Sequence, residues 1–150
     1  MPGPKPRVID KRLSPKALII DDSALMRKII RYHLEQLGFT VTGEAEDAKS
    51  AMRLFEQVRP DLVTLDVLMP EVEGLSAVSA FRTFRKQAPQ MAIVIVSSLS
   101  AEQVERPFMK EGALGHLPKT FEGFSFDRIV PKLVGVFAQL PQREQKAKCS

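Results

Sequence analysis

The chain has a single cysteine, Cys149, so it cannot form an internal disulfide. The lack of a disulfide framework fits a reducing compartment, and we expect a cytoplasmic protein. No apolar run approaches the roughly 20 residues that a membrane-spanning helix requires. The N-terminal segment also lacks the basic start, apolar stretch and small-residue cleavage site of a secretory signal. A disulfide-stabilised secreted domain and a membrane-spanning protein are therefore not expected.

The excess of basic residues lies at the two ends of the chain. The net charge of the 150 residues is +4. Residues 1–16 carry five Lys and Arg against one Asp, and residues 141–150 carry three against one Glu, which leaves −2 for the remainder. We predict a flexible basic leader over 1–15, one folded domain over 16–140 and a disordered basic tail over 141–150. Because the folded part is mildly acidic, neither nucleic acid nor a membrane surface is an expected partner.

Short apolar segments alternate with helical patterns along the chain. The strand-like segments, which are rich in β-branched residues, cover 17–20, 40–45, 62–65, 92–96 and 114–117. The helical patterns cover 23–38, 47–60, 75–87, 101–111 and 126–140. Ser23 and Asp47 stand where N-caps are expected, and Gly38 stands at a helix exit. Pro107 strains the fourth helical pattern, and Pro131 marks a bend or a late start in the fifth.

This alternation predicts an α/β fold with a doubly wound parallel sheet. The connections are too short for anything but right-handed crossovers, which cover both faces of a parallel sheet with helices. In such sheets the functional site lies beyond the carboxyl ends of the strands. That edge is where chemistry-bearing side chains are expected to meet.

Polar side chains follow the predicted strands at that edge. The first strand ends in Asp21-Asp22, the third in Asp66 and the fourth in Ser97, and Lys119 follows the fifth. Carboxylates gathered in this way repel one another unless a cation intervenes, and a hard divalent cation such as Mg²⁺ suits oxygen ligands. An ammonium group and a hydroxyl beside it are well placed for the oxygens of a phosphoryl group.

The order of these motifs resembles the receiver domains of two-component response regulators, the CheY-like family. The matching segments are LIIDDS (18–23), DVLMPEVEG (66–74), VIVSS (94–98), GALGH (112–116) and Lys119. DDSALMR and VSSLS look particularly like the receiver half of chemotaxis methylesterase regulators. The resemblance covers about 16–140 and implies a flavodoxin-like sheet of five parallel strands in the order 2-1-3-4-5, with five helices.

The resemblance also implies a metal site and a phosphoacceptor. Asp66 aligns with the nucleophile that takes the phosphoryl group. Asp22 aligns with the direct ligand of Mg²⁺, together with the Asp66 carboxylate and the backbone carbonyl of Leu68. Asp21 aligns with the acid that holds the metal largely through water.

The remaining aligned residues concern the phosphoryl group and the switch. Lys119 aligns with the lysine that pairs with phosphoryl oxygens. Ser97, rather than Ser98, aligns with the switching hydroxyl, and His116 stands where the family has an aromatic ring or histidine whose rotamer reports the state. The family usually has proline directly after the lysine, whereas Pro118 precedes Lys119 here.

The function that the resemblance implies is that of a stand-alone response regulator. It would accept a phosphoryl group from a histidine kinase and change the surface of its fourth helix and fifth strand. It would then bind an output protein, with chemotaxis favoured as the pathway. We expect a signalling module with slow self-dephosphorylation rather than an enzyme, monomeric or weakly dimeric after phosphorylation.

Two other functions remain open on the sequence. One is a receiver-like scaffold that binds partners without phosphorylation, although a scaffold does not need the acidic set. The other is an aspartyl phosphatase, which typically needs a second acid two residues after the nucleophile, where this chain has Leu68. The same apolar side chain faces the predicted site entrance, and we expect it to slow attack by water on the acyl phosphate.

Overall fold

The computed structural model describes residues 14–119 and 124–137. Most of the predicted leader, the whole predicted tail with Cys149, and Thr120 lie outside the described residues. The division into leader, domain and tail therefore stays a prediction.

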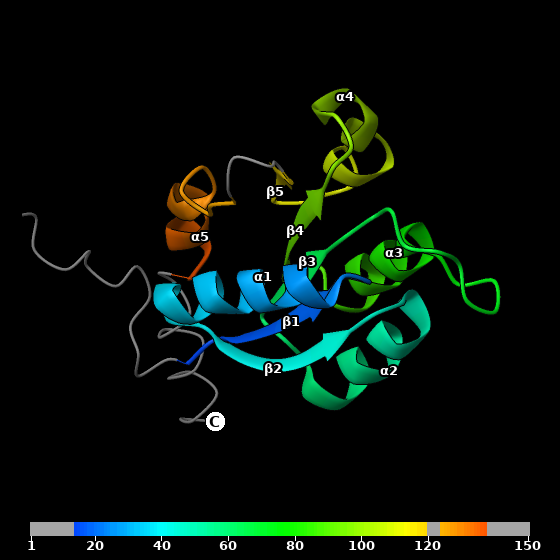
Figure 1. Ribbon diagram of the computed structural model, residues 1–150, viewed down its shortest axis with the longest axis horizontal. Coiled ribbons are helices and arrows are strands. Elements are labelled where there is room, and N and C mark those ends of the chain that lie inside the picture. The colour runs from blue at the N-terminus through cyan, green and yellow to red at the C-terminus, as the bar shows by residue number, and fades with distance from the viewer. Residues whose placement is uncertain (1–13, 120–123, 138–150) are drawn as a thin grey trace, which may run out of the picture.

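Strands and helices alternate along the described chain as the sequence predicts. They are β1 (Lys16–Ile20), α1 (Ala24–Leu37), β2 (Thr40–Ala45), α2 (Ala48–Val58), β3 (Leu62–Leu65), α3 (Ala77–Gln87), β4 (Ala92–Ser97), α4 (Ala101–Val104), η1 (Glu105–Met109), β5 (Gly115–Pro118) and α5 (Val130–Phe137). All strand pairs are parallel, and the sheet order is β2-β1-β3-β4-β5. The predicted fold class and strand order are confirmed (Figure 1).

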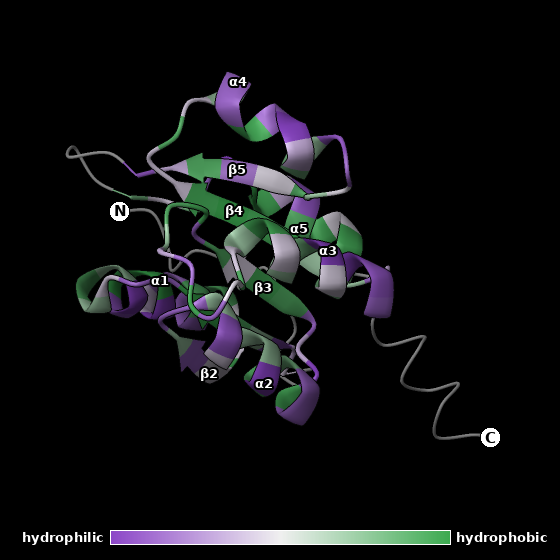
Figure 2. Ribbon diagram, turned by 90° about the vertical axis from the view of Figure 1, so that its right-hand side faces the viewer, coloured by the Kyte–Doolittle hydropathy of each residue, from purple (hydrophilic) through white to green (hydrophobic). Residues whose placement is uncertain are grey.

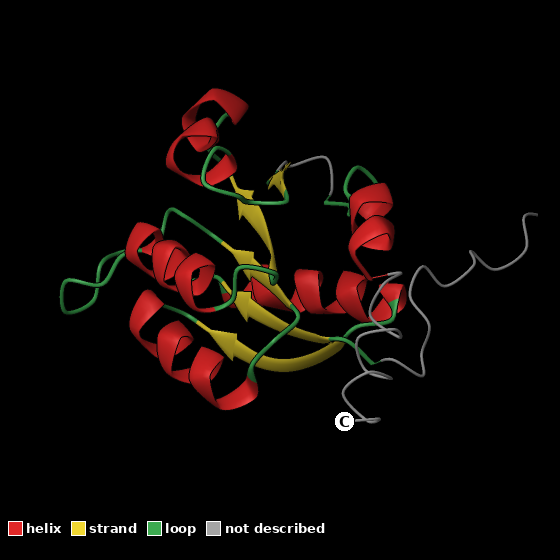
Figure 3. Ribbon diagram, turned by 180° about the vertical axis from the view of Figure 1, so that it is seen from behind, coloured by secondary structure: helices red, strands yellow, loops and turns green. Residues whose placement is uncertain are grey.

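Helices cover both faces of the sheet. Alternate residues of each strand point to opposite sides, so apolar side chains on both faces are buried under helices. On one face, residues from α2, α3 and η1 pack against the strands in a single buried cluster. On the other face, a second cluster joins the strands to α1 and α5. Figure 3 shows the helices on either side of the strands, and Figure 2 shows that the central strands β3 and β4 are mostly hydrophobic. Burial on both faces explains why every residue of β3 and β4 is buried.

Side-chain caps set the starts of four helices, α1 to α4, the last of them through Ser100. The Ser23 hydroxyl accepts a hydrogen bond from the backbone N–H of Met26, and the Asp47 carboxylate accepts one from the N–H of Ser50 at 2.8 Å. Ser76 caps α3 in the same way. α1 ends at Gly38, whose φ of 104° is a left-handed conformation that glycine adopts without strain. The caps at Ser23 and Asp47 agree with the sequence prediction.

The fourth helical pattern differs from the prediction of one helix over 101–111. α4 ends at Val104, and Arg106 has the extended values φ −122° and ψ 133°. Pro107 is the reason, since a residue before proline is pushed out of the helical region. The backbone resumes a wide helical turn in η1, and Phe108 from this turn is buried against the sheet.

The third helix starts later than expected, and the fifth has the late start that Pro131 indicated. Leu75 lies outside α3 and exchanges two backbone hydrogen bonds with Val72, which closes a tight turn. α5 starts at Val130 rather than at Phe126, which instead opens a turn through bonds to its carbonyl. Pro131 then stands in the first turn of α5, where its missing N–H would have no helical partner. Among the described residues, no helix is long and apolar enough to cross a membrane.

Candidate functional site

The carboxyl edge of the sheet brings the predicted site residues together. Asp21 directly follows β1 and Asp66 directly follows β3, and the last residues of these paired strands, Ile20 and Leu65, are in register. Backbone hydrogen bonds hold both acids in place. The N–H of Asp66 donates to the carbonyl of Ile20 at 2.9 Å, and the N–H of Asp21 donates to the carbonyl of Ala45 at 2.9 Å. The two carboxylates are therefore carried by rigid neighbouring strands.

Lys119 reaches across this edge and contacts both acids. Its Nζ atom lies 2.8 Å from Oδ2 of Asp21 and 3.1 Å from Oδ2 of Asp66. Burial alone would lower the pKa of Lys119, but the close contact with the Asp21 carboxylate and the charge of Asp66 outweigh it, so the pKa is raised. The lysine is therefore protonated at neutral pH and partly balances the acids. Its reach is achieved although proline precedes it in the chain.

Asp66 is almost fully buried, with 2% of its surface exposed. Burial raises the pKa of its carboxyl, and the negative charge of Asp21 adds to this effect. The Leu68 N–H, which donates to Oδ1 at 3.0 Å, and the Lys119 ammonium act in the opposite direction without cancelling it. A carboxylate held in this way combines low hydration with a fixed orientation, as a nucleophile requires.

The residues present fit a hard divalent cation. Asp21, Asp22 and Asp66 each offer a carboxylate oxygen, and these three atoms lie within 4.8 Å of one another. Asp21 is buried, whereas Asp22 is exposed and faces solvent. All three donors are oxygen atoms, which suits Mg²⁺. Leu68, whose carbonyl is the fourth predicted ligand, follows Asp66 by two residues, and its side chain is 50% exposed.

Ser97 and His116 meet at one carbonyl group. The Ser97 side chain is fully buried, and its Oγ accepts a hydrogen bond from the Leu99 N–H at 3.3 Å, whereas Ser98 is exposed. The Ser97 carbonyl accepts the Lys119 N–H at 3.0 Å and lies 3.4 Å from Nε2 of His116. The His116 side chain therefore contacts the backbone carbonyl of Ser97 rather than its hydroxyl.

One residue at this edge was not among the sequence predictions. Arg27, one turn into α1, donates from Nη1 to the carbonyl oxygen of Asp21 at 2.7 Å. It is the last letter of the DDSALMR motif, and its position one helical turn after the cap was the available signal. What the sequence does not show is its second partner, Glu44, on a neighbouring strand.

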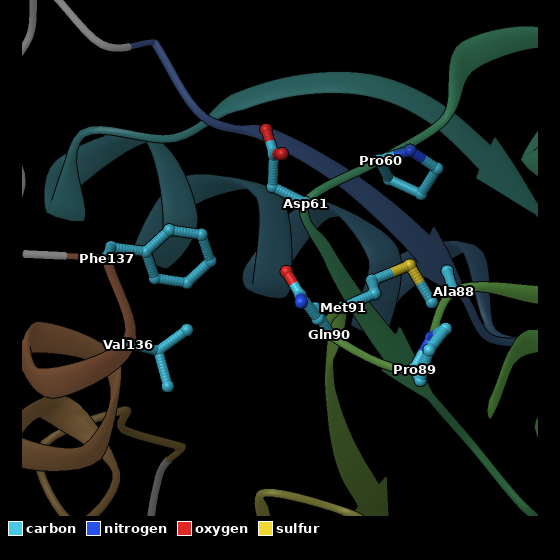
Figure 4. Close-up of a pocket in the computed structure, with 8 residues that line it drawn as sticks. All are labelled: Pro60, Asp61, Ala88, Pro89, Gln90, Met91, Val136 and Phe137. Atoms are coloured by element: carbon cyan, nitrogen blue, oxygen red, sulfur yellow. The ribbon is translucent and has the colours of Figure 1, made fainter. Parts of the chain in front are cut away.

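A separate hollow lies at the opposite edge of the sheet. It has a volume of about 420 Å³ and is lined by residues around Asp61 and Met91, which precede β3 and β4, and by Val136 and Phe137 of α5. Figure 4 shows these side chains around the opening. Since Asp66 and Ser97 lie at the other ends of the same strands, this hollow is not part of the acidic site.

Comparisons with known proteins agree with this geometry. The model of the response regulator receiver domain matches residues 17–130. Chemotaxis protein CheY of Listeria monocytogenes is 31% identical over 118 residues, which cover 79% of this chain and 94% of that protein. A protein-glutamate methylesterase/protein-glutamine glutaminase of Pyrococcus horikoshii is 33% identical over 137 residues, which cover 85% of this chain and 36% of that protein.

Solved structures show the same fold. The response regulator domain of Thermotoga maritima CheB has a TM-score of 0.63 and 28% identity, covering 84% of this chain and 95% of that one. A chain of the CheX-CheY-BeF3-Mg complex from Borrelia burgdorferi has a TM-score of 0.73 and 23% identity, covering 89% and 98%. The matched family model spans most of the chain and includes the acidic edge of the sheet. The chain therefore belongs to the response regulator receiver domain family, with a CheY-like fold.

Proposed function

We propose that this receiver accepts a phosphoryl group on Asp66 from a histidine kinase, with Mg²⁺ bound beside it, and then switches a protein-binding surface. Receiver domains take phosphate from kinases and interact with output proteins, and this chain belongs to that family. The observation that carries the proposal is the convergence of three carboxylates and the Lys119 ammonium at one edge of the sheet.

The chemistry follows from the position of Asp66. One carboxylate oxygen forms a bond to phosphorus while the phosphorus–nitrogen bond of the donor phosphohistidine breaks, and the product is an acyl phosphate. Lys119 pairs with the phosphoryl oxygens, since its ammonium already lies 3.1 Å from Asp66. Asp22, Asp66 and the Leu68 carbonyl would hold Mg²⁺ directly and Asp21 largely through water, and the bound cation would supply positive charge for the oxygens of the transferring group.

The switch follows from the added negative charge. The Ser97 hydroxyl accepts a hydrogen bond from the Leu99 N–H. A phosphoryl group on Asp66 offers strong acceptor oxygens, which draw the Ser97 hydroxyl toward them and give His116 room to change its rotamer. The surface of α4 and β5 then changes, and an output protein reads it. This is a cytoplasmic signalling module that loses its phosphoryl group slowly, not a metabolic enzyme.

Labelling with a small phosphodonor tests the proposal. Wild-type protein incubated with Mg²⁺ and acetyl phosphate is expected to gain one acid-labile phosphoryl group, detected by intact mass, and Asp66→Asn is expected to gain none. Asp61→Asn is the matched control, because Asp61 lies just before the amino end of the same strand, far from the acidic site, and its carboxylate accepts the backbone N–H of Lys16. Absence of labelling in wild type, or equal labelling of Asp66→Asn, contradicts the proposal.

The binding of an output protein separates this function from a scaffold. Affinity for a partner is expected to change between unphosphorylated and phosphorylated wild type and to stay at the unphosphorylated value in Asp66→Ala. Tight binding that Asp66→Ala leaves unaffected would favour a scaffold. Turnover of phosphomonoesters would favour the phosphatase instead, and none is expected.

A further inference from the structure

The backbone of the Asp21-Asp22 loop is held on three sides. The Asp21 N–H donates to the carbonyl of Ala45 at 2.9 Å, and the Asp21 side chain accepts the N–H of Ser23 at 2.9 Å. The third hold is on the carbonyl oxygen of Asp21, which accepts a hydrogen bond from Nη1 of Arg27 at 2.7 Å. This carbonyl belongs to the planar peptide unit that also contains the nitrogen of Asp22.

The orientation of the Asp22 side chain depends on that peptide unit more than the orientations of the Asp21 and Asp66 side chains do. Its side chain is exposed and makes no hydrogen bond or ion pair with any residue that the structure describes. Asp21 and Asp66, in contrast, are both tied to Lys119. The direction in which the Asp22 carboxylate leaves the loop is therefore set by backbone orientation, which Arg27 fixes from one side.

Arg27 is itself held in place from β2. Its Nε donates to Oε1 of Glu44 at 3.2 Å, and its side chain is 19% exposed. The other carboxylate oxygen of Glu44 accepts two bonds from Arg31, at 2.9 and 2.7 Å. Glu44 thus fixes the guanidinium plane, and Arg27 uses two different nitrogens for two partners. A lysine ammonium cannot reproduce this planar fork.

We propose that Arg27 is a positioning residue for the Mg²⁺ site, which orients the Asp21-Asp22 peptide and so presents the Asp22 carboxylate to the cation. The inference rests on the proposed function, since it assumes that these acids bind Mg²⁺. Groups that orient metal ligands from behind commonly change metal affinity by about 10- to 100-fold when they are lost.

Loss of the positive charge of Arg27 and loss of its positioning role would change Mg²⁺ affinity in opposite directions. The two explanations can therefore be told apart. A cation beside three carboxylates disfavours Mg²⁺, so removing it would tighten binding if charge were decisive. The Glu44 carboxylate pairs with the guanidinium and reduces this contribution. Orientation therefore predicts weaker binding for both Arg27→Ala and Arg27→Lys. Charge alone predicts tighter binding for Arg27→Ala and no change for Arg27→Lys.

The experiment is a calorimetric titration of the unphosphorylated full chain with MgCl₂. We expect the dissociation constant of Arg27→Ala and Arg27→Lys to rise about tenfold. Lys28→Ala is the matched control, because Lys28 is the next residue of α1, is exposed and carries the same charge. Its dissociation constant is expected to equal that of wild type. Thermal unfolding in EDTA checks that each variant is folded, and Arg27→Lys decides the matter if Arg27→Ala does not fold.

The outcomes separate this inference from the proposed function. If wild type binds Mg²⁺ and is labelled on Asp66 but Arg27→Lys binds Mg²⁺ equally well, the positioning role of Arg27 is wrong and the function stands. Tighter binding by Arg27→Ala would also overturn the role. If wild type shows neither Mg²⁺ binding nor labelling, the proposed function fails and the inference fails with it.

Discussion

The Nζ atom of Lys119 lies 2.8 Å from Oδ2 of Asp21, so a protonated lysine balances a carboxylate that has no exposed surface. The same ammonium lies 3.1 Å from Asp66. Because a buried carboxylate is costly without a partner, this ion pair stabilises the acidic edge in the absence of metal. A cation that enters the site has to compete with the lysine for these oxygens.

Replacing Lys119 by methionine is therefore expected to separate metal binding from phosphoryl transfer. Mg²⁺ affinity should rise by at least about fivefold, since two unit charges 4 Å apart interact by about 1 kcal/mol even with the screening of bulk water. Labelling by acetyl phosphate should become slower, because the phosphoryl oxygens lose a cationic partner. Calorimetric titration and a labelling time course measure the two effects. Lys86→Met, at an exposed position of α3, serves as control, and unchanged Mg²⁺ affinity in Lys119→Met would refute the competition.

Leu68 is predicted to prolong the life of the acyl phosphate. Its side chain is 50% exposed two residues after Asp66, where an apolar group gives no hydrogen bond to an attacking water. Leu68→Asn is expected to shorten the half-life by up to about tenfold, which corresponds to about 1.4 kcal/mol in the barrier. The decay of labelled protein after removal of the donor measures it. Val134→Asn, at another exposed apolar position, should decay like wild type. A wild-type half-life no longer than that of Leu68→Asn argues against this role.

Asp47 is predicted to make stability depend on pH. The hydrogen bond from the Ser50 N–H lowers the pKa of this helix-capping carboxyl. A lowered folded-state pKa means that the carboxylate contributes its full stabilisation above a pH of about 4, the range of the unfolded carboxyl, and loses it as the pH falls through the folded-state pKa. Removal of the cap in Asp47→Ala should lower the unfolding free energy by about 1 kcal/mol at neutral pH.

Asp47→Asn provides the control for this titration, because the amide oxygen caps the helix but does not ionise. Urea unfolding between pH 6 and pH 3 is the measurement. We expect the unfolding free energy of wild type to fall toward that of Asp47→Asn in the acid range, whereas other carboxyl groups affect both proteins alike. Parallel curves for the two proteins over the whole range would show that the prediction is wrong.

Gly115 is predicted to be required for packing between β5 and the segment that leads into α5. A Cβ atom at this buried position would lie 2.0 Å from Cδ1 of Ile129, which is itself buried. Gly115→Ala is therefore expected to lower the unfolding free energy by about 1–3 kcal/mol. Urea unfolding measures the change.

Two variants control for the Gly115 prediction. Gly135→Ala lies in α5 with open space around the new Cβ, and it should raise stability by about 0.5–1 kcal/mol. In an Ile129→Val background the clashing Cδ1 is absent, so Gly115→Ala should cost less there. If Gly115→Ala lowered the unfolding free energy equally in wild type and in Ile129→Val, the clash with Cδ1 of Ile129 would not be the cause.

The strand positions and the fold were predictable from sequence because buried parallel strands are short, β-branched and regularly spaced. The predicted fifth strand, 114–117, differs from Gly115–Pro118 by one residue. The fourth helix was less predictable, because apolar periodicity continued through Pro107 while the backbone conformation of Arg106 did not. Leu75 was misassigned for a similar reason, since its apolar character suits both a helix start and the tight turn that it closes.

The grouping of the acidic residues was predictable because the carboxyl ends of parallel strands lie at the same edge of the sheet. The contacts within it were not. That Lys119 reaches both Asp21 and Asp66 depends on the path of β5 and on a side-chain conformation that spacing does not encode. The link from Arg27 to Glu44 depends on which strand lies beside β1 at its carboxyl end. The roles of these residues in phosphoryl transfer stay predictions until the labelling experiment is done.

The shortness of α4 bears on how a partner would recognise this receiver. Four residues form too few hydrogen bonds to offset the entropy of starting a helix, and the extended Arg106 prevents η1 from prolonging it. The segment is anchored to the core mainly through Val104 and Phe108. Its amide protons should therefore exchange with solvent sooner than those of α1 or α2. A protein that binds this surface would supply part of the free energy that orders it, so recognition and local folding would occur together.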